Sequence, residues 1–157
     1  MSEPGTVGFA PDEIRTAEPT RAARLKWVIV VDAQLPAGRA ANAAACVAAA
    51  TSRGVHGLLG PEAVDAAGAS HPGLPWAGCT VLAADTAKLG RIRRKAASRA
   101  GVHVADMPVD AQLTRVYDEY LERMTTQDAE SIGYAAVSLV GPRAQVDRLV
   151  GGLPLLA

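Results

Sequence analysis

The longest apolar pattern in the chain is a β-branched run that leads into an alanine-rich stretch. Residues 27–31 (Trp-Val-Ile-Val-Val) carry no charge, which is typical of a strand buried on both faces, as in the middle of a parallel or mixed sheet. A polar turn that starts at Asp32 follows, and residues 39–52 then predict a helix closed by Gly54. The polar turn is therefore expected at the carboxyl edge of the sheet, where open α/β folds bind ligands.

Further along the chain, apolar stretches alternate with amphipathic ones. Strands are expected over residues 79–84, 102–107, 134–140 and 153–156. Helices are expected to begin at the caps Asp85 and Asp110 and after the pair Gly141-Pro142. Strands that alternate with helices indicate a three-layer αβα domain with right-handed crossovers, around a mixed, mostly parallel sheet of four to five strands.

Two segments depart from this alternation. Residues 1–24 are polar and rich in Pro, Gly and Thr, which predicts a flexible tail, disordered or draped on the surface, ahead of a domain over residues 25–157. Glycines and prolines break any period over residues 55–78. A connection of that length is usually functional or disordered. Its apolar residues, Trp76 among them, predict that it packs down over the sheet edge.

Composition and charge narrow the class of protein. Sixteen basic residues balance sixteen acidic ones, so no overall field favours nucleic acid or a membrane surface. No apolar run approaches the length of a membrane span, and the N-terminus does not have the pattern of a signal peptide. Cys46 and Cys79 have no metal or disulfide spacing, which fits a reducing cytoplasm. We expect a cytoplasmic α/β domain with no metal site, no cofactor and no membrane partner.

The alanine-rich helix carries the first candidates for chemistry. Arg39, Asn42 and Cys46 recur at three- and four-residue steps and therefore share one helix face. Asn42 is the most polar group of that helix, and it holds either a ligand or a loop of its own chain. Cys46 is a candidate nucleophile, because a helix N-terminus and Arg39 would favour the thiolate. The alternative for Cys46 is plain packing among alanines.

Two other features suggest a base and a partner. His71 lies in a Ser-His-Pro-Gly sequence with Asp65 upstream, and is either a general base above the sheet edge or a structural loop residue. The helix after Asp85 carries a basic stripe, which suits tRNA phosphates or is simply solvated. The stripe consists of Lys88, Arg91, Lys95 and Arg99.

At these residues the chain resembles known families. Residues 26–50 resemble the opening of the type 2 peptidyl-tRNA hydrolases, a K-x-V-I-V-V strand followed by D-L-K-M-G-K-G-K-x-A-A-Q-C-x-H-A-A. The coinciding residues are Leu35, Gly38, Ala43, Ala44, Cys46, Ala49 and Ala50. Residues 140–156 resemble that family's closing I-G-P and G-x-L-K-L-L. The match is closer to a bacterial branch grouped with these hydrolases, the domain-of-unknown-function 2000 family. Its pattern resembles Leu35-Pro36, Asn42-Ala43-Ala44-Ala45, Leu59-Gly60-Pro61 and His71-Pro72-Gly73.

The resemblance implies the type 2 peptidyl-tRNA hydrolase fold and a homodimer, but the catalytic positions of the hydrolases differ here. Their second lysine corresponds to Ala41, and their first to Arg39, which keeps the charge and can contact a phosphate or carboxylate. Their D-A-G-x-T sequence is matched only by Glu122 and Thr126, and their helix histidine by Ala48. Losing one such electrostatic donor costs roughly 3 kcal/mol of transition-state stabilisation.

Two classes of function follow from these residues. One is a hydrolase-like enzyme for an acyl ester or amide, including a tRNA-linked one. Its catalytic candidates are Asn42, Cys46, His71 and Thr126, and its substrate-binding candidates are Arg39, Asp32 and Glu122. The other is a non-catalytic module that binds a small ligand or a partner at the same edge. A third hypothesis is an enzyme that uses the same fold to act on a different small substrate. A base within hydrogen-bond reach of Asn42 and Cys46 would favour an enzyme, and an apolar or loop-filled edge would favour a binding module.

Overall fold

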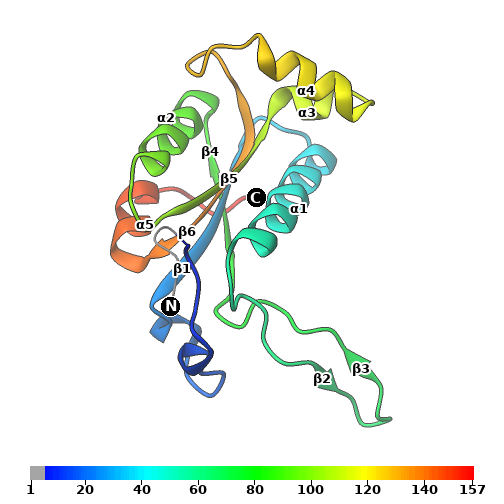
Figure 1. Ribbon diagram of the computed structural model, residues 1–157, viewed down its shortest axis with the longest axis vertical. Helices are drawn as coiled ribbons and strands as arrows, with labels where there is room; N and C mark the ends of the chain where they lie inside the picture. The colour runs from blue at the N-terminus through cyan, green and yellow to red at the C-terminus, as the bar shows by residue number, and fades with distance from the viewer. Residues whose placement is uncertain (1–5) are drawn as a thin grey trace.

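The computed structural model describes residues 6–157, which form a four-stranded sheet in the order β4-β1-β6-β5 (Figure 1). The strands are β1 (Leu25–Asp32), β4 (Thr80–Ala84), β5 (His103–Pro108) and β6 (Tyr134–Pro142). β1 runs parallel to β4, whereas β6 runs antiparallel to both β1 and β5. The α/β class and the mixed sheet are confirmed, and the expectation of a mostly parallel sheet is wrong.

The connection between β5 and β6 explains the difference. The chain leaves β5 at Pro108 and enters β6 at Tyr134, which is the register partner of Pro108. It therefore returns at the same end of the sheet, so that β6 runs back against β5 instead of crossing over. A strand–helix–strand pattern in the sequence does not distinguish a crossover from such a return.

Helices cover both faces of the sheet. α1 (Ala37–Gly54) packs on one face, and α2 (Thr86–Ala97) and α5 (Arg143–Val150) pack on the other (Figure 1). β1 serves both layers, because its alternate residues point to opposite faces. Ile29 and Val31 pack with α1, and Val28 and Val30 pack with α2 and α5. β1 is therefore covered on both faces, as its continuous apolar run predicts.

A hydrogen-bond network of one indole and two hydroxyl groups fastens α1 to the sheet. Trp27 Nε1 donates to Ser138 Oγ at 2.8 Å, and the oxygens of Ser138 and Thr51 lie 2.7 Å apart. Because the Thr51 hydroxyl donates to the Val47 carbonyl at 2.7 Å, Ser138 is the donor to Thr51. Ser138 and Thr51 are fully buried. This network sets where α1 lies over β1 and β6.

The segment after β5 forms two helices where one was expected. α3 (Val109–Leu113) begins after Pro108, with Asp110 in its first turn and not at its cap, and α4 (Tyr117–Thr125) begins after Val116. The backbone is extended at Thr114, whose hydroxyl donates to the Asp110 carbonyl at 2.9 Å. The Asp110 carboxylate accepts from Arg123, in the last turn of α4, and from Gln127 just beyond that helix. These bonds hold α3 and α4 together as a layer beyond the end of the sheet.

Residues 59–75 form a projecting arm, a name used below for this segment. β2 (Ala63–Val64) and β3 (Ser70–His71) pair antiparallel near its tip, and the arm points away from α3 and α4 (Figure 1). At its base Leu58 is buried and Trp76 Nε1 donates to the Gly57 carbonyl at 2.7 Å. The expectation that this connection packs down holds for the base and is wrong for the arm, and the C-terminal segment takes the place beside β4 at the edge of the sheet.

The C-terminal segment lines the outer edge of β4. Leu155 forms an isolated antiparallel bridge with Leu82, and the Ala83 amide donates to the Pro154 carbonyl at 2.9 Å. The expected last strand over residues 153–156 is therefore reduced to this short pairing. The sheet has four strands with this addition at its edge.

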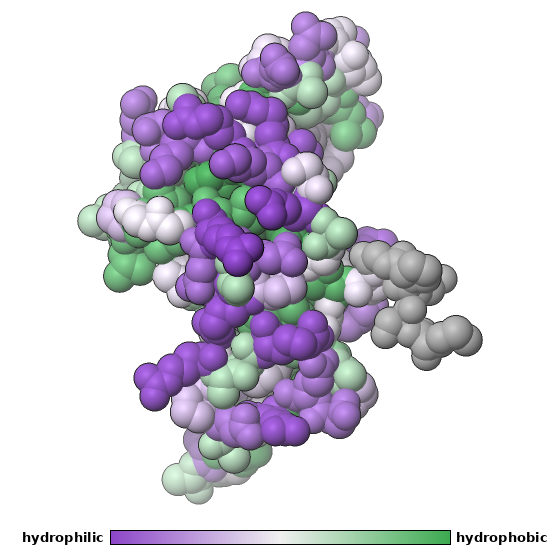
Figure 2. All heavy atoms as spheres, turned by 90° about the vertical axis from the view of Figure 1, so that its left-hand side faces the viewer, coloured by the Kyte–Doolittle hydropathy of each residue, from purple (hydrophilic) through white to green (hydrophobic). Residues whose placement is uncertain are grey.

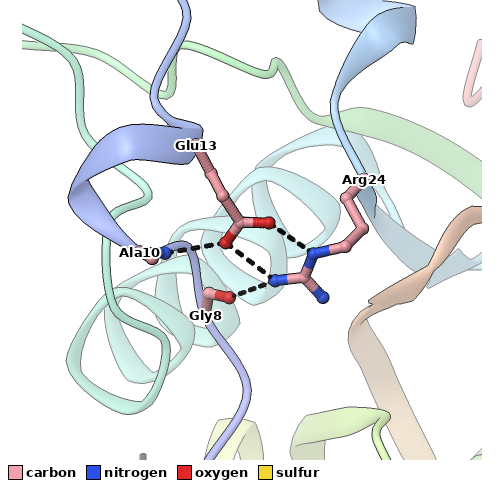
Figure 3. Close-up of polar contacts among 4 residues, drawn as sticks. All are labelled: Gly8, Ala10, Glu13 and Arg24. Atoms are coloured by element: carbon pink, nitrogen blue, oxygen red, sulfur yellow. Dashed lines mark hydrogen bonds and ion pairs between the residues drawn. The ribbon is translucent and has the colours of Figure 1, made fainter.

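The described part of the N-terminal segment, residues 6–24, lies against the domain. Phe9 is buried and its ring centroid lies 4.8 Å from that of Trp76. Two short 3-10 turns, η1 (Pro11–Glu13) and η2 (Thr20–Ala22), shape the segment. Figure 3 shows how Arg24 fastens it, with bonds to both Glu13 oxygens and to the Gly8 carbonyl. Residues 1–5 of the expected tail lie outside the described residues, and the division of the chain at residue 24 stays a prediction.

The Glu13 contacts predict a pH dependence of stability. Hydrogen bonds from Arg24 and from the Ala10 amide lower the pKa of Glu13 from 4.5 to about 2. Because the folded pKa lies below the unfolded one, the stabilisation is complete above pH 4.5 and is lost as the pH falls toward 2. The pair is partly exposed, so we expect this contribution to be about 0.5–1 kcal/mol.

Urea unfolding at pH 6 and pH 3 measures the effect. Glu13→Gln should remove that part of the difference between the two pH values, while the matched variant Glu18→Gln, at an exposed ion pair with Arg15, should leave it as in the wild type. Equal pH dependence in wild type and Glu13→Gln would contradict the assignment.

Candidate functional site

A cavity of about 590 Å³ lies between α1, the end of β5 and the α3–α4 layer. We call it the α1–α4 pocket. Its volume is in the range of small-molecule sites. One wall is α1, which contributes Asn42, Cys46, Ala49 and Ala50, and the facing wall comes from residues 106–120. Two of the residues that the sequence singled out, Asn42 and Cys46, therefore lie in one pocket.

Asn42 is oriented by a neighbour on α3. The Gln112 side-chain amide donates to Asn42 Oδ1 at 3.2 Å and to the Arg39 carbonyl at 2.9 Å. With its oxygen used in this way, Asn42 keeps its amide nitrogen as a donor. Within residues 6–157 that nitrogen has no acceptor. Asn42 thus combines the two roles that the sequence left open, a contact to its own chain and a group available to a ligand.

Three polar pocket residues, Asp106, Arg115 and Tyr120, are not apparent from the sequence pattern. Asp106 Oδ2 accepts from Arg93 Nε at 3.0 Å, and the Arg93 guanidinium lies 5.5 Å from the centroid of the Tyr134 ring. The Asp106 charge is therefore already neutralised by a cation from α2. An acidic residue within an apolar strand was the available signal for this pair. Arg115 forms no ion pair with any described residue.

Tyr120 is a hydrogen-bond donor in this setting. Burial raises the pKa of its phenol, and the negative charge of Asp106 raises it further. Both effects disfavour the phenolate, so the hydroxyl keeps its proton at neutral pH. The ring packs edge-on against Tyr117, with centroids 5.6 Å apart. Tyr117 and Tyr120 have the helical spacing of an amphipathic stripe, and the α3–α4 layer presents both rings at the pocket.

The remaining candidates lie elsewhere. Asp32 is buried at the end of β1, where its carboxylate accepts from the Gln34 amide at 2.9 Å and from the Thr86 hydroxyl at 2.8 Å. It is used to join β1 to α2, which explains why it does not line the α1–α4 pocket. Glu122 is exposed on α4, and the Thr126 hydroxyl donates to the Arg123 carbonyl at 3.1 Å as the helix ends. Neither residue contributes to the pocket wall.

His71 sits at the tip of the arm, at β3. Its Nε2 lies 3.2 Å from Asp65 Oδ2, as the sequence position of Asp65 suggested, and its side chain is 60% exposed. Amide hydrogen bonds from Ala69 and a bond from His71 lower the pKa of Asp65. The imidazole is oriented by a carboxylate, but the arm carries it away from the pocket of its own chain.

Among residues 6–157 there is no group of three or more His, Cys, Asp or Glu side chains that could hold a metal ion. No helix among them is long and apolar enough to cross a membrane.

Comparisons with known proteins identify relatives of this fold. A family model described as "Protein of unknown function (DUF2000)" matches residues 25–157. Among solved structures, a protein of unknown function from Agrobacterium tumefaciens strain C58, Atu0240, is similar with a TM-score of 0.78 and 17% sequence identity. The match covers 85% of this chain and 98% of that chain. No curated protein matches. An identity of 17% shows a shared fold, and the resemblance to peptidyl-tRNA hydrolases stays a prediction.

Proposed function

The chain belongs to the DUF2000 family, and on that premise we propose that the α1–α4 pocket binds a small molecule rich in hydrogen-bond acceptors. The ligand carries a carboxylate, phosphate or acyl oxygen on an apolar or aromatic body. The observation that supports this ligand class is the polarity of the pocket, in which the available polar groups are donors.

Three donors support an anionic or carbonyl group. They are the Asn42 amide nitrogen, the Tyr120 hydroxyl and the Arg115 guanidinium. The carboxylate of the same pocket, Asp106, is held by Arg93. A negatively charged ligand therefore meets little repulsion, and charge-assisted bonds to it are stronger than neutral ones.

The apolar lining supports a flat or aliphatic body. Met107 and Pro108 are buried beneath the pocket, while Val116 and Tyr117 are exposed at its rim. Apolar walls with a few placed polar groups are typical of small-ligand sites. The basic stripe on α2 lies across the sheet from α1, in the hydrophilic area that Figure 2 shows over α2. This separation favours a small molecule over tRNA as the occupant.

The test uses a probe of matching chemistry, 8-anilinonaphthalene-1-sulfonate, which joins an anion to aromatic rings. We expect its fluorescence to saturate at one site per chain. Arg115→Gln should weaken binding about three- to tenfold, as for a partly exposed ionic contact. Ala50→Trp should abolish it by filling the pocket. The matched variant Arg91→Gln, on exposed α2, should bind like the wild type. Unchanged binding in both pocket variants would overturn the proposal.

Hydrolysis of an acyl ester or amide is the second candidate, because Cys46 lies in the same pocket one turn from Asn42. Within one chain the pocket offers this reaction no free general base, because Asp106 is engaged by Arg93 and His71 lies on the arm. The deciding assay is release of an N-blocked amino acid from a peptidyl-tRNA mimic and from its simple ethyl ester. Turnover that collapses in Asn42→Ala and Cys46→Ser supports the enzyme. No turnover by folded protein leaves the binding module.

A further inference from the structure

We propose that the arm of a second copy of this chain covers the open side of the α1–α4 pocket and brings His71 to it. The proposal rests on the proposed function in that the pocket is taken as the ligand site. Each copy would then give an arm and receive one, in the isologous arrangement of a two-fold dimer.

The first argument is that the arm exposes apolar side chains that its own chain does not cover. Val64 is 68% exposed and Leu74 is 75% exposed. Each of its strands is two residues long, and an isolated two-stranded hairpin is marginal in water. Local bonds nevertheless shape the tip, because Asp65 accepts from the amides of Ala67 and Ala69. A preshaped apolar projection of this kind suits docking into a second body.

The second argument is that the chain offers a matching apolar surface. Among residues 6–157, the exposed large hydrophobic side chains outside the arm, apart from Leu155, belong to the α3–α4 layer. They are Leu113, Val116, Tyr117 and Leu121. Val116 and Tyr117 form the rim of the α1–α4 pocket and are 53% and 73% exposed. The molecule therefore presents one convex and one concave apolar surface.

Charge complementarity identifies a second copy as the occupant. The arm carries Glu62 and Asp65 and no lysine or arginine, whereas α1 carries Arg39 and Arg53 and no acidic residue. Arg115 adds a third cation at the pocket. An acidic arm laid along α1 thus meets opposite charge at both ends of the helix, which fixes register and favours association.

Geometry excludes the arm of the same chain. The arm leaves the domain beside the C-terminal end of α1 and points away from the α3–α4 layer (Figure 1). One limb, residues 59–66, spans roughly 26 Å when extended. In a two-fold pair that length carries the tip of one arm along α1 of the other copy, toward its pocket.

The arm would supply the group that the pocket lacks. Asp65 holds His71 through Nε2, which leaves Nδ1 as the nitrogen that faces a ligand. For the hydrolytic candidate, Nδ1 removes the proton of the Cys46 thiol as the sulfur bonds to the acyl carbon, and the same proton passes to the leaving oxygen as the ester C–O bond breaks. Nδ1 then takes a proton from water as the water oxygen bonds to the thioester carbon, and this proton returns to the sulfur as the C–S bond breaks. No oxidant, reductant or further reactant is needed.

Disulfide trapping tests the arrangement without any ligand. In a Cys79→Ser background, which retains Cys46, His71→Cys should form an intermolecular disulfide on mild oxidation, seen as a dimer on a non-reducing gel. Ser98→Cys, exposed at the end of α2, is the control and should stay monomeric on the gel. Adding Cys46→Ser to His71→Cys should remove the dimer band. A band that persists without Cys46, or a disulfide within one chain, would overturn the proposal.

Sedimentation equilibrium gives an independent readout. The wild type should have twice the mass of one chain, and Val64→Glu with Leu74→Glu should weaken association at least thirtyfold. Leu155→Glu changes an exposed leucine outside both surfaces and should remain dimeric. A monomeric wild type would overturn the interface. Cross-linking without probe binding would keep the interface and reject the ligand site. Probe binding by a monomeric protein would keep the ligand site and reject the interface.

Discussion

Replacing Ser138 by alanine is expected to lower the free energy of unfolding by about 2–4 kcal/mol. Ser138 accepts from the Trp27 indole and donates to Thr51 in a fully buried site. Alanine removes both bonds, so the indole N–H loses its acceptor and the Thr51 oxygen loses a donor. A buried polar group without a partner costs its full desolvation penalty, which is larger than the net value of a typical hydrogen bond.

Urea denaturation measures this loss, with Ser52→Ala as the matched control on the exposed face of α1. The control should change stability by less than about 0.5 kcal/mol. Combining Ser138→Ala with Thr51→Val and Trp27→Phe removes every partner, so the triple variant should cost clearly less than the sum of the single changes. Additive effects would show that the three groups do not form one network.

The second large effect is expected at the base of the arm, where Gly73→Ala should destabilise the local fold by about 2 kcal/mol. A Cβ at Gly73 would collide with the Gly60 carbonyl oxygen, which belongs to the backbone and cannot rotate aside. The neighbouring bond from the Gly60 amide to the Leu74 carbonyl, 2.8 Å long, would be strained with it. Because the arm contributes little to the core, global unfolding should change much less.

Hydrogen exchange resolves the two outcomes. The amides of Gly60 and Trp76 should exchange about thirtyfold faster in Gly73→Ala, which is 2 kcal/mol expressed as an opening constant. Gly38→Ala is the matched control, since a Cβ at Gly38 meets nothing within 4 Å. Unchanged exchange at Gly60 would mean that the two limbs of the arm separate at little cost. If the arm forms the proposed interface, the same variant should also weaken the dimer.

The local elements were predictable because their patterns report local chemistry. The apolar run of β1 and the alanine-rich α1 were located to within two residues at each end. Their burial pattern and helix propensity depend on residues that are close together in the sequence. The direction of β6 was not predictable in this way, because it depends on the end of the sheet at which the chain returns. A composition rich in glycine and proline likewise marked the arm without showing that it projects.

The candidate site was predictable only in part, for a similar reason. Helical spacing places Asn42 and Cys46 on one face in any fold, and the pocket contains both. Tyr117 and Tyr120 have the spacing of a core stripe, but periodicity does not state what an apolar face meets. Asp106 and Arg93 approach each other only because α2 lies beside β5. Contacts of that kind depend on the assembled fold.

The pairing of β1 with β6 sets an order of events for folding. These central strands join residues 25–31 to residues 136–142 of the same sheet, so the contacts that close the core connect segments more than one hundred residues apart. Contacts of such high sequence separation slow folding. During synthesis, β1 and α1 must therefore wait for β6 to emerge before their apolar faces are covered. The middle of the sheet is the last part of the molecule to become complete.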